Sequence, residues 1–285
     1  MSESELLLPA GPARSEVVQR WQVAAAQIES ALEQHLVVAF LGSASAGKDS
    51  AIRALFGMDF GEIDPIPGST EQVRVAAIDE RGQVLVVNAP GFGDVRSEVD
   101  AKARDILDQV DLAVYILNAD GGATIDERTD LDAIRAMGRP VLVCINKIDL
   151  IRPHQRDVFI AQTLEQLGVD KADAIVTAFD PMPVLSDKPI GVDKVVAWIH
   201  RHLADQGKDL LFAKSLRNKS AACQAIIRTA ARRAAMAGAI PMVGVDATAV
   251  TAVQVKLIAD IASVYERRLD NDVALFVLGE ILSGG

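Results

Sequence analysis

Residues 41–57 read LGSASAGKDSAIRALFG and continue an apolar run that is typical of a buried strand. Gly42 and Gly47 are separated by four residues, and Lys48 follows directly. Small residues at this spacing let successive backbone N–H groups turn around an anion, and a helix starting near Lys48 points its positive end at the same place. The stretch predicts a strand, a phosphate-binding loop and a helix. Taken alone, it could also be a chance turn of small residues.

Apolar runs alternate with helical patterns from residue 36 to about residue 205. Continuous Val, Ile and Leu runs are typical of strands covered on both faces, and their alternation with helices predicts parallel strands with right-handed crossovers. The second and third runs are joined by the short segment DERGQ, so we expect one antiparallel edge strand. The six runs are residues 36–42, 72–78, 84–90, 112–119, 140–147 and 174–179.

Two regions flank this α/β segment. Residues 1–35 predict a tail, up to about residue 14, and then a helix with apolar side chains at helical spacing. Residues 206–285 carry no strand pattern, and we expect a small all-α domain there, either complete or a fragment. Its helices are predicted at residues 215–236, 247–268 and 272–282, with a break at Pro241 and Gly244.

Composition narrows the classes of function. The chain has 285 residues, of which 50% are hydrophobic, and a formal net charge of −10. A large core can be buried, whereas direct binding to bare nucleic acid is not expected, because the phosphates would be repelled. No secretory signal and no run of 18 apolar residues is present. Cys144 and Cys223 are predicted to be unpaired thiols of a reduced, cytoplasmic protein.

The run VLVCINKIDL ends in Asn146, Lys147, Ile148 and Asp149. A carboxylate at this place can accept two N–H donors from the edge of a guanine base, while the amide faces the ring nitrogens and the lysine stem packs on the ring. Adenine lacks those two donors, and an unpaired buried carboxylate costs about 1–3 kcal/mol or more. The segment therefore predicts guanine recognition. The alternative is a polar strand end that caps a helix.

With these motifs, residues 35–205 resemble a GTPase of the Era-like branch of the P-loop superfamily. The segment NAPGFGDV (88–95) is similar to the family's Asp-x-x-Gly motif, which makes Gly91 the sensor of the γ-phosphate. The segment PIPGSTEQV (65–73) resembles the first switch, in which Thr70, or Ser69, closes on the metal and the γ-phosphate. The segment VTAFD (176–180) resembles the last motif, whose backbone faces the guanine oxygen.

The resemblance implies a three-layer P-loop NTPase fold with a mostly parallel six-stranded sheet, followed by the small all-α domain. It also implies GTP or GDP and Mg²⁺ as ligands. The expected catalytic residues are Lys48, Thr70 and Gly91, and the expected metal ligands are Asp49, Thr70 and Asn88. The expected nucleotide-binding residues are Gly42, Ser43, Ala44, Ser45, Ala46, Gly47, Lys48, Asp49, Ser50, Asn146, Lys147, Asp149, Thr177 and Ala178.

Two positions depart from the family pattern. A hydroxyl is usual after the loop lysine, and an aspartate begins the Asp-x-x-Gly motif, but this chain has Asp49 and Asn88 there. The formal charge around a metal is unchanged by this exchange. One hypothesis is that Asp49 ligates Mg²⁺ and Asn88 orients a bound water. The rival is decay of the site, because two unit charges about 4 Å apart repel by roughly 4 kcal/mol at a dielectric near 20.

The sequence lacks both of the residues that commonly promote GTP hydrolysis in related proteins. Phe92 follows Gly91, where some GTPases have a glutamine, and Ser45 stands where relatives activated by a cation have an asparagine. We expect slow GTP hydrolysis, stimulated by a partner, by self-association or by an arginine supplied in trans. The alternative is a pseudo-GTPase that binds GTP or GDP without hydrolysis and acts as a membrane-surface or protein scaffold. Asp94 and Arg96 are polar candidates from the second switch, unless they lie in a solvated loop.

Residues 211–245 contain no acid and six bases. They form either a solvated or domain-docked helix face, or a surface for anionic lipid headgroups or a partner, with peripheral membrane localisation as the consequence. Residues 234–270 resemble the helical domain of unknown function that often follows Era-like GTPases and is membrane-associated in some members. The resemblance is carried by Ile240, Pro241, Gly244 and Asp246. The small residues of this region also suit close helix contacts and self-association.

Overall fold

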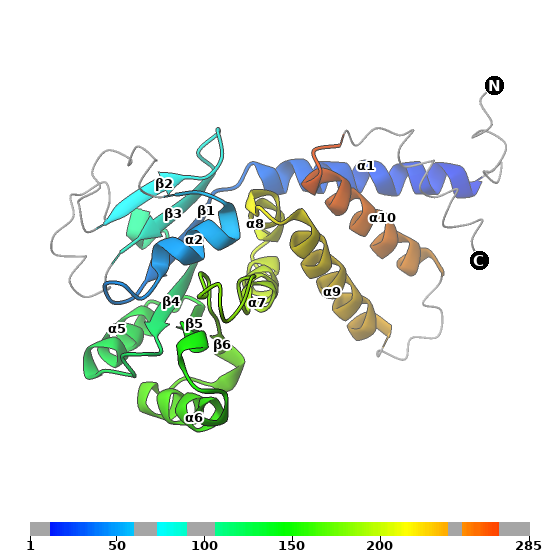
Figure 1. The fold of residues 1–285 in the computed structure, drawn as a ribbon. Coiled ribbons are helices and arrows are strands. Elements are labelled where there is room, and N and C mark those ends of the chain that lie inside the picture. Colours follow the sequence, from blue (N-terminus) through cyan, green and yellow to red (C-terminus); the bar gives the residue numbers. More distant parts are fainter. Residues whose placement is uncertain (1–11, 60–72, 90–105, 239–246, 268–285) are drawn as a thin grey trace. The chain divides into compact units, whose positions relative to one another are not determined.

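The computed structural model describes residues 12–59, 73–89, 106–238 and 247–267 (Figure 1). The chain divides into two compact units. One is continuous and comprises His35–Asn218, and the other combines Met1–Gln34 with Lys219–Gly285. The helix at residues 209–215 therefore belongs to the first unit, together with the sheet.

The first unit is built on a six-stranded sheet with strand order β2-β3-β1-β4-β5-β6. Every pairing is parallel except that of the edge strand β2 with β3, as the short 79–83 connection predicts. The mostly parallel six-stranded α/β fold expected from the sequence is confirmed. The strands are β1 (Leu36–Leu41), β2 (Arg74–Ala77), β3 (Val84–Asn88), β4 (Leu112–Asn118), β5 (Val141–Asn146) and β6 (Ala174–Val176).

Helices cover both faces of this sheet, which makes three layers (Figure 1). The core on one face combines alternate residues of β1, such as Val37 and Leu41, with Leu131 and Leu167 of α5 and α6. On the other face the ring of Phe56 packs edge to face against Phe40 and against Phe212, with centroids 6.1 Å apart in both pairs. The helices are α2 (Lys48–Phe56), α5 (Ile125–Ala136), α6 (Arg156–Leu167), α7 (Val192–Ala204) and α8 (Asp209–Ser215).

Short elements complete the unit at both ends of the sheet. One turn of 3₁₀-helix follows β5 at Ile148–Leu150, another lies at Pro153–Gln155, and a third at Lys171–Asp173 precedes β6. Lys208, just before α8, lies 2.6 Å from the carboxylate of Asp111, just before β4. This buried carboxylate also accepts the backbone N–H of Val37 at 3.0 Å, so it ties α8 to two central strands.

The second unit is helical, with α1 (Pro12–Leu32), α9 (Lys219–Gly238) and α10 (Ala247–Val264). α1 buries Trp21 and Ile28, and α10 buries Val255 and Ala259. α1 begins inside the stretch expected to be a tail, with Pro12 in the first turn, where a missing N–H costs nothing. The predicted break at residues 241–244 and the predicted helix at 272–282 lie outside the described residues. Within the described ranges, none of the helices combines the length and the hydropathy that a membrane span requires.

Candidate nucleotide-binding site

The loop between β1 and α2 has a backbone that two glycines make possible. Gly42 has φ +134°, and a Cβ at this position would overlap the carbonyl oxygen of Ile116 on β4. Gly47 has φ +101°, and a Cβ there would overlap the side-chain amide of Asn146. Both residues thus need a left-handed backbone and a missing side chain. The spacing that identifies the loop in the sequence is imposed by its close packing against β4 and β5.

Lys48 opens α2 and folds back over the loop. Its Nζ donates to the carbonyl oxygens of Gly42 at 2.8 Å and Ser43 at 3.0 Å. Burial lowers the pKa of the Lys48 ammonium, and the neighbouring Asp49 carboxylate opposes that effect. The positive charge is therefore held directly over the backbone that would surround a phosphate group.

The exchanged pair Asp49 and Asn88 is in direct contact. Asn88, at the end of β3, donates its Nδ2–H to Oδ1 of Asp49 at 2.5 Å. Asp49 lies in the first turn of α2, where a negative charge is favoured by the helix dipole. In the described part of the chain, neither the other carboxylate oxygen nor the amide oxygen of Asn88 has a hydrogen-bond partner.

This donor set fits Mg²⁺, which prefers carboxylate and other oxygen ligands. Within the described ranges, no group of three or more His, Cys, Asp or Glu side chains could hold a metal ion. A cation at Asp49 and Asn88 would therefore complete its coordination with phosphate oxygens and water. Ser50, the next residue on α2, lines the cavity described below.

Asn146, at the end of β5, connects the loop to the segment after β6. Its Nδ2 donates to the carbonyl oxygen of Ala46 at 2.8 Å. Its Oδ1 accepts from the hydroxyl of Thr177 at 3.3 Å and from the backbone N–H of Phe179 at 3.1 Å. The side chain is buried, and one amide hydrogen remains for a ligand. The network holds the three segments of the site in fixed positions.

Next to Asn146 lies a cavity of about 220 Å³. Lys147 has φ +62°, which turns the chain sharply after β5, and Asp149 follows in the 3₁₀ turn. One carboxylate oxygen of Asp149 accepts the backbone N–H of Met182 at 3.2 Å, and its other oxygen is left for a ligand. The cavity is lined by Gly47, Ser50, Asn146, Lys147, Asp149, Leu150, Ala178, Phe179, Asp180 and Met182.

The backbone donors expected to face the guanine oxygen have other partners. The N–H of Thr177 donates to the carbonyl of Ile145 at 2.8 Å, and that of Ala178 donates to Ile190 at 3.1 Å. An isolated bridge between Ala178 and Ile190 explains the second contact. This geometry corrects the expectation for these two N–H groups, although Ala178 does line the cavity.

Four wall residues of the cavity are not among the nucleotide-binding residues predicted from the sequence. Leu150 directly follows the motif that ends at Asp149, whereas Phe179 and Asp180 lie within the segment 176–180, and their position was the available signal. Nothing in the sequence indicates that Met182 lies at the site, because it is the path of a loop that brings Met182 next to Asp149. The predicted catalytic and switch residues Thr70 and Gly91, with Ser69, Phe92, Asp94 and Arg96, lie outside the described residues.

Comparison with known proteins agrees with this geometry. Residues 37–147 match the model of a family described as 50S ribosome-binding GTPase. The chain contains a P-loop GTPase domain. Residues 202–284 match a domain of unknown function, DUF697, in agreement with the resemblance noted for the C-terminal region.

Several curated GTP-binding proteins are similar to part of this chain. The tRNA modification GTPase MnmE of Desulforamulus reducens is 25% identical over 195 residues, or 65% of this chain and 39% of that protein. A probable GTP-binding protein EngB of Gemmatimonas aurantiaca is 27% identical over 49% of this chain and 72% of its own length. The GTPase Der of Citrifermentans bemidjiense is 28% identical over 49% of this chain, which spans 32% of that protein.

Among solved structures, the FeoB G-domain from Methanococcus jannaschii aligns with 60% of this chain and 99% of that domain, at 19% identity and a TM-score of 0.39.

Proposed function

We propose that this chain is a GTP-binding switch whose slow GTP hydrolysis is stimulated by a partner or by self-association. The single observation that carries the proposal is the Asn146 amide, which joins the phosphate-binding loop at Ala46 to the segment after β6. The cavity beside it is lined by Gly47 of the loop and by Asp149. One mononucleotide would place its phosphates at the loop and its base at Asp149.

Guanine is the base that fits the polar groups of this cavity. The open oxygen of Asp149 accepts N–H donors, and guanine presents them on one edge, whereas adenine does not. Lys147, Leu150 and Met182 supply stems and apolar surface against which a ring can pack. A base lacking those donors would leave the carboxylate unpaired, at a cost of about 1–3 kcal/mol.

At the phosphate end, a bound cation and the loop backbone would both contact the phosphate groups. Lys48 and the loop N–H groups would take the phosphate oxygens, and Asp49, Asn88 and Thr70 would hold Mg²⁺. When bound, Mg²⁺ neutralises charge on the phosphates and so removes the repulsion between them and Asp49. Asn88 already orients the Asp49 carboxylate through its amide hydrogen. Gly91 would contact the γ-phosphate and so distinguish GTP from GDP.

A titration of GTP and GDP affinity against Mg²⁺ tests the role of the exchanged pair. We expect GTP affinity to rise steeply with Mg²⁺, because Asp49 opposes the metal-free triphosphate. An affinity that does not respond to Mg²⁺ would contradict the assignment. Single-turnover phosphate release at increasing protein concentration then separates hydrolysis stimulated by self-association from hydrolysis by the isolated chain.

The second candidate is a non-hydrolysing scaffold at a membrane surface. It is favoured by α9, where Arg228, Arg232 and Arg233 are exposed together with Ile227. Exposed bases beside an apolar side chain suit anionic lipid headgroups, and localisation would then be peripheral at the membrane. Flotation with anionic vesicles that is equal in GTP and GDP, without phosphate release at any protein concentration, would favour this candidate over the switch.

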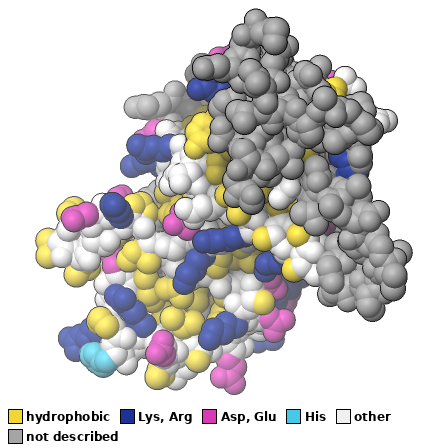
Figure 2. Space-filling view, turned by 90° about the vertical axis from the view of Figure 1, so that its right-hand side faces the viewer, with side chains coloured by type: hydrophobic (Ala, Val, Ile, Leu, Met, Phe, Trp, Pro, Cys, Tyr) yellow, Lys and Arg dark blue, Asp and Glu magenta, His cyan; other side chains and the backbone are white. Residues whose placement is uncertain are grey.

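Direct binding to nucleic acid is not part of either proposal. The net charge is −10, and on the face in Figure 2 the Lys and Arg side chains are interspersed with acidic and hydrophobic ones. A nucleic-acid surface needs a continuous field of positive charge.

A further inference from the structure

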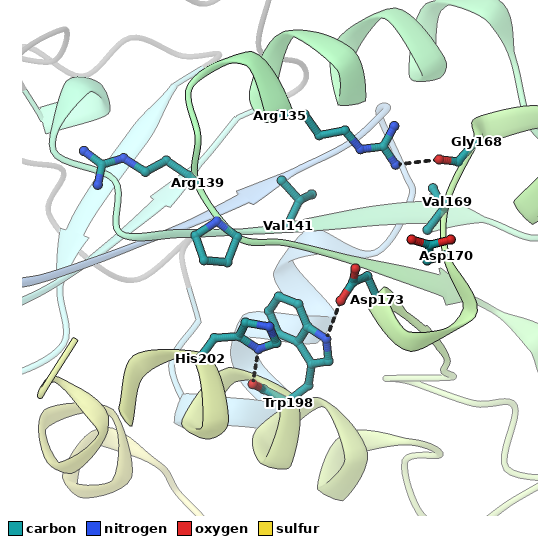
Figure 3. Close-up of a pocket in the computed structure, with 10 residues that line it drawn as sticks. Arg135, Arg139, Val141, Gly168, Val169, Asp170, Asp173, Trp198 and His202 are labelled. Carbon is teal, nitrogen blue, oxygen red and sulfur yellow. Dashed lines mark hydrogen bonds between the residues drawn. The ribbon is translucent and has the colours of Figure 1, made fainter. Parts of the chain in front are cut away.

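A second cavity, of about 500 Å³, lies in the sheet unit away from the nucleotide site (Figure 3). Pro140 and Val141 line it where β5 begins, and Asp170 and Asp173 line it just before β6. The phosphate-binding loop follows the carboxyl end of β1, and β1, β4, β5 and β6 run parallel. The cavity is therefore at the opposite end of the strands, and its occupant would not compete with a nucleotide.

Internal contacts fix the walls of this cavity. Arg135 donates to the carbonyl oxygen of Gly168 at 3.1 Å, which joins the end of α5 to the turn after α6. The indole of Trp198 on α7 donates to Asp173 at 3.2 Å, and the ring of His202 stacks on it at 3.7 Å. The imidazole Nδ1 in turn donates to the carbonyl of Trp198 at 2.9 Å. These contacts hold the side chains of Arg135, Trp198 and His202 in place around the cavity.

Two side chains of opposite charge at the cavity are available to pair with a ligand. The guanidinium of Arg139 and the carboxylate of Asp170 have no hydrogen-bond or ion-pair partner in the described part of the chain. Figure 3 shows them on opposite sides of Val141, and Pro140 also lines the cavity. The other charged groups at the cavity are Arg135, which also pairs with Asp132 at 3.1 Å, and Asp173, which is bonded to the indole. The free charges are therefore one cation and one anion, separated by apolar surface.

We propose that this cavity binds an extended peptide segment of a partner protein, in which an acidic and a basic side chain flank a small apolar residue. The acidic side chain pairs with Arg139, the basic one pairs with Asp170, and the apolar residue lies over Pro140 and Val141. The volume falls within the range of about 300–1,000 Å³ that is usual for ligand sites. A free anion would meet two aspartates and a free cation two arginines, so only a ligand with both charges is complementary to the whole cavity.

A random-peptide display selection on the purified full chain tests this proposal. We expect enrichment of peptides with one acidic and one basic residue separated by an apolar residue. Arg139→Glu or Asp170→Lys alone should reduce binding of the enriched peptides at least about 10-fold, because each leaves a like-charge pair. The double variant should enrich peptides in which the acidic and basic positions are exchanged.

Arg152→Glu is the matched control, because Arg152 is exposed but does not line the cavity. This variant should keep the wild-type selection. Arg139 and Asp170 are exposed, so both variants are expected to fold, and circular dichroism checks this. The proposal is overturned if the wild-type chain enriches no such charge pattern, or if the double variant enriches the same peptides as the wild type. Neither outcome depends on GTP binding, so the two proposals fail separately.

Discussion

The base end and the phosphate end of the nucleotide site differ in how their polar side chains are used. At the base end, Asn146 makes three hydrogen bonds within the protein, and one carboxylate oxygen of Asp149 remains available at the cavity. At the phosphate end, Asp49 and Asn88 bond to each other. The first arrangement holds the groups that would recognise the base in place before a nucleotide binds. The second leaves oxygen atoms that would act on the phosphates only through a bound cation.

This difference separates two questions about the domain. In the proposed function, the identity of the base follows from groups that are already in position, and these groups match the usual guanine motif. The chemistry at the phosphates depends on a pair of residues that has exchanged a carboxylate between two elements, α2 and β3. Variants at the base end should therefore change which nucleotide binds, and variants at the phosphate end should change how binding depends on metal and pH.

The largest effect is expected for Asp149→Asn. The variant places an amide donor against the N–H donors of guanine, so we expect GDP affinity to fall by about 100-fold or more, or at least about 2.8 kcal/mol. The same amide suits the C2 carbonyl of xanthine, and affinity for xanthosine diphosphate should rise. Calorimetry with both diphosphates measures the two effects. Asp180→Asn is the control, since Asp180 lines the same cavity, and an equal loss there would remove the special role of Asp149.

The next effect concerns the charge of Lys48. Burial lowers the pKa of its ammonium, so the charge that attracts phosphate is lost as pH rises, earlier than for an exposed lysine. We expect Lys48→Ala to reduce GDP affinity at pH 7 by about 10- to 100-fold, and wild-type affinity to decline between neutral and alkaline pH. Lys48→Arg retains its charge and controls for titration of the nucleotide itself. Parallel pH profiles for wild type and Lys48→Arg would contradict this explanation.

An intermediate effect is expected for the exchanged pair. Asp49→Ser removes the carboxylate. The factor by which Mg²⁺ raises the affinity for GTP should then be about 10-fold smaller than in the wild type. Asn88→Asp sets two carboxylates in contact in place of the observed hydrogen bond, and should lower thermal stability. The double variant restores one carboxylate, and we expect it to recover most of the metal dependence. If the two substitutions prove additive in a double-mutant cycle of GTP affinity against Mg²⁺, the pair does not act as a unit.

The smallest effect is expected for the cysteines. Burial within β5 raises the pKa of the Cys144 thiol, so it should stay protonated and unreactive at neutral pH, whereas the partly exposed Cys223 should react. Mass spectrometry after treatment with a thiol reagent should find one label on the native chain and two after unfolding. Labelling of native Cys144 would show that the strand leading to Asn146 opens, contrary to the fixed base end described above.

Much of the fold could be predicted from the sequence, because each strand is an uninterrupted apolar run and the loop glycines have a fixed spacing. From the exchanged residues, the sequence suggested that Asp49 and Asn88 share a metal ion. It did not predict that their side chains form a hydrogen bond with each other. The N–H groups of Thr177 and Ala178 were misjudged, because their acceptors include Ile190, which a loop brings back to the sheet. Met182 and the opposed charges of Arg139 and Asp170 depend on loop positions that periodicity does not encode.

The central claim is that a guanine nucleotide binds with its phosphates at the loop before Lys48 and its base at Asn146 and Asp149. Isothermal titration calorimetry of the folded chain with GDP and with GTP, in the presence of Mg²⁺, tests it most directly, with ADP as the reference. We expect saturable one-to-one binding of both guanine nucleotides and much weaker binding of ADP. Absence of binding heat for both GDP and GTP, while circular dichroism shows a folded protein, would contradict it.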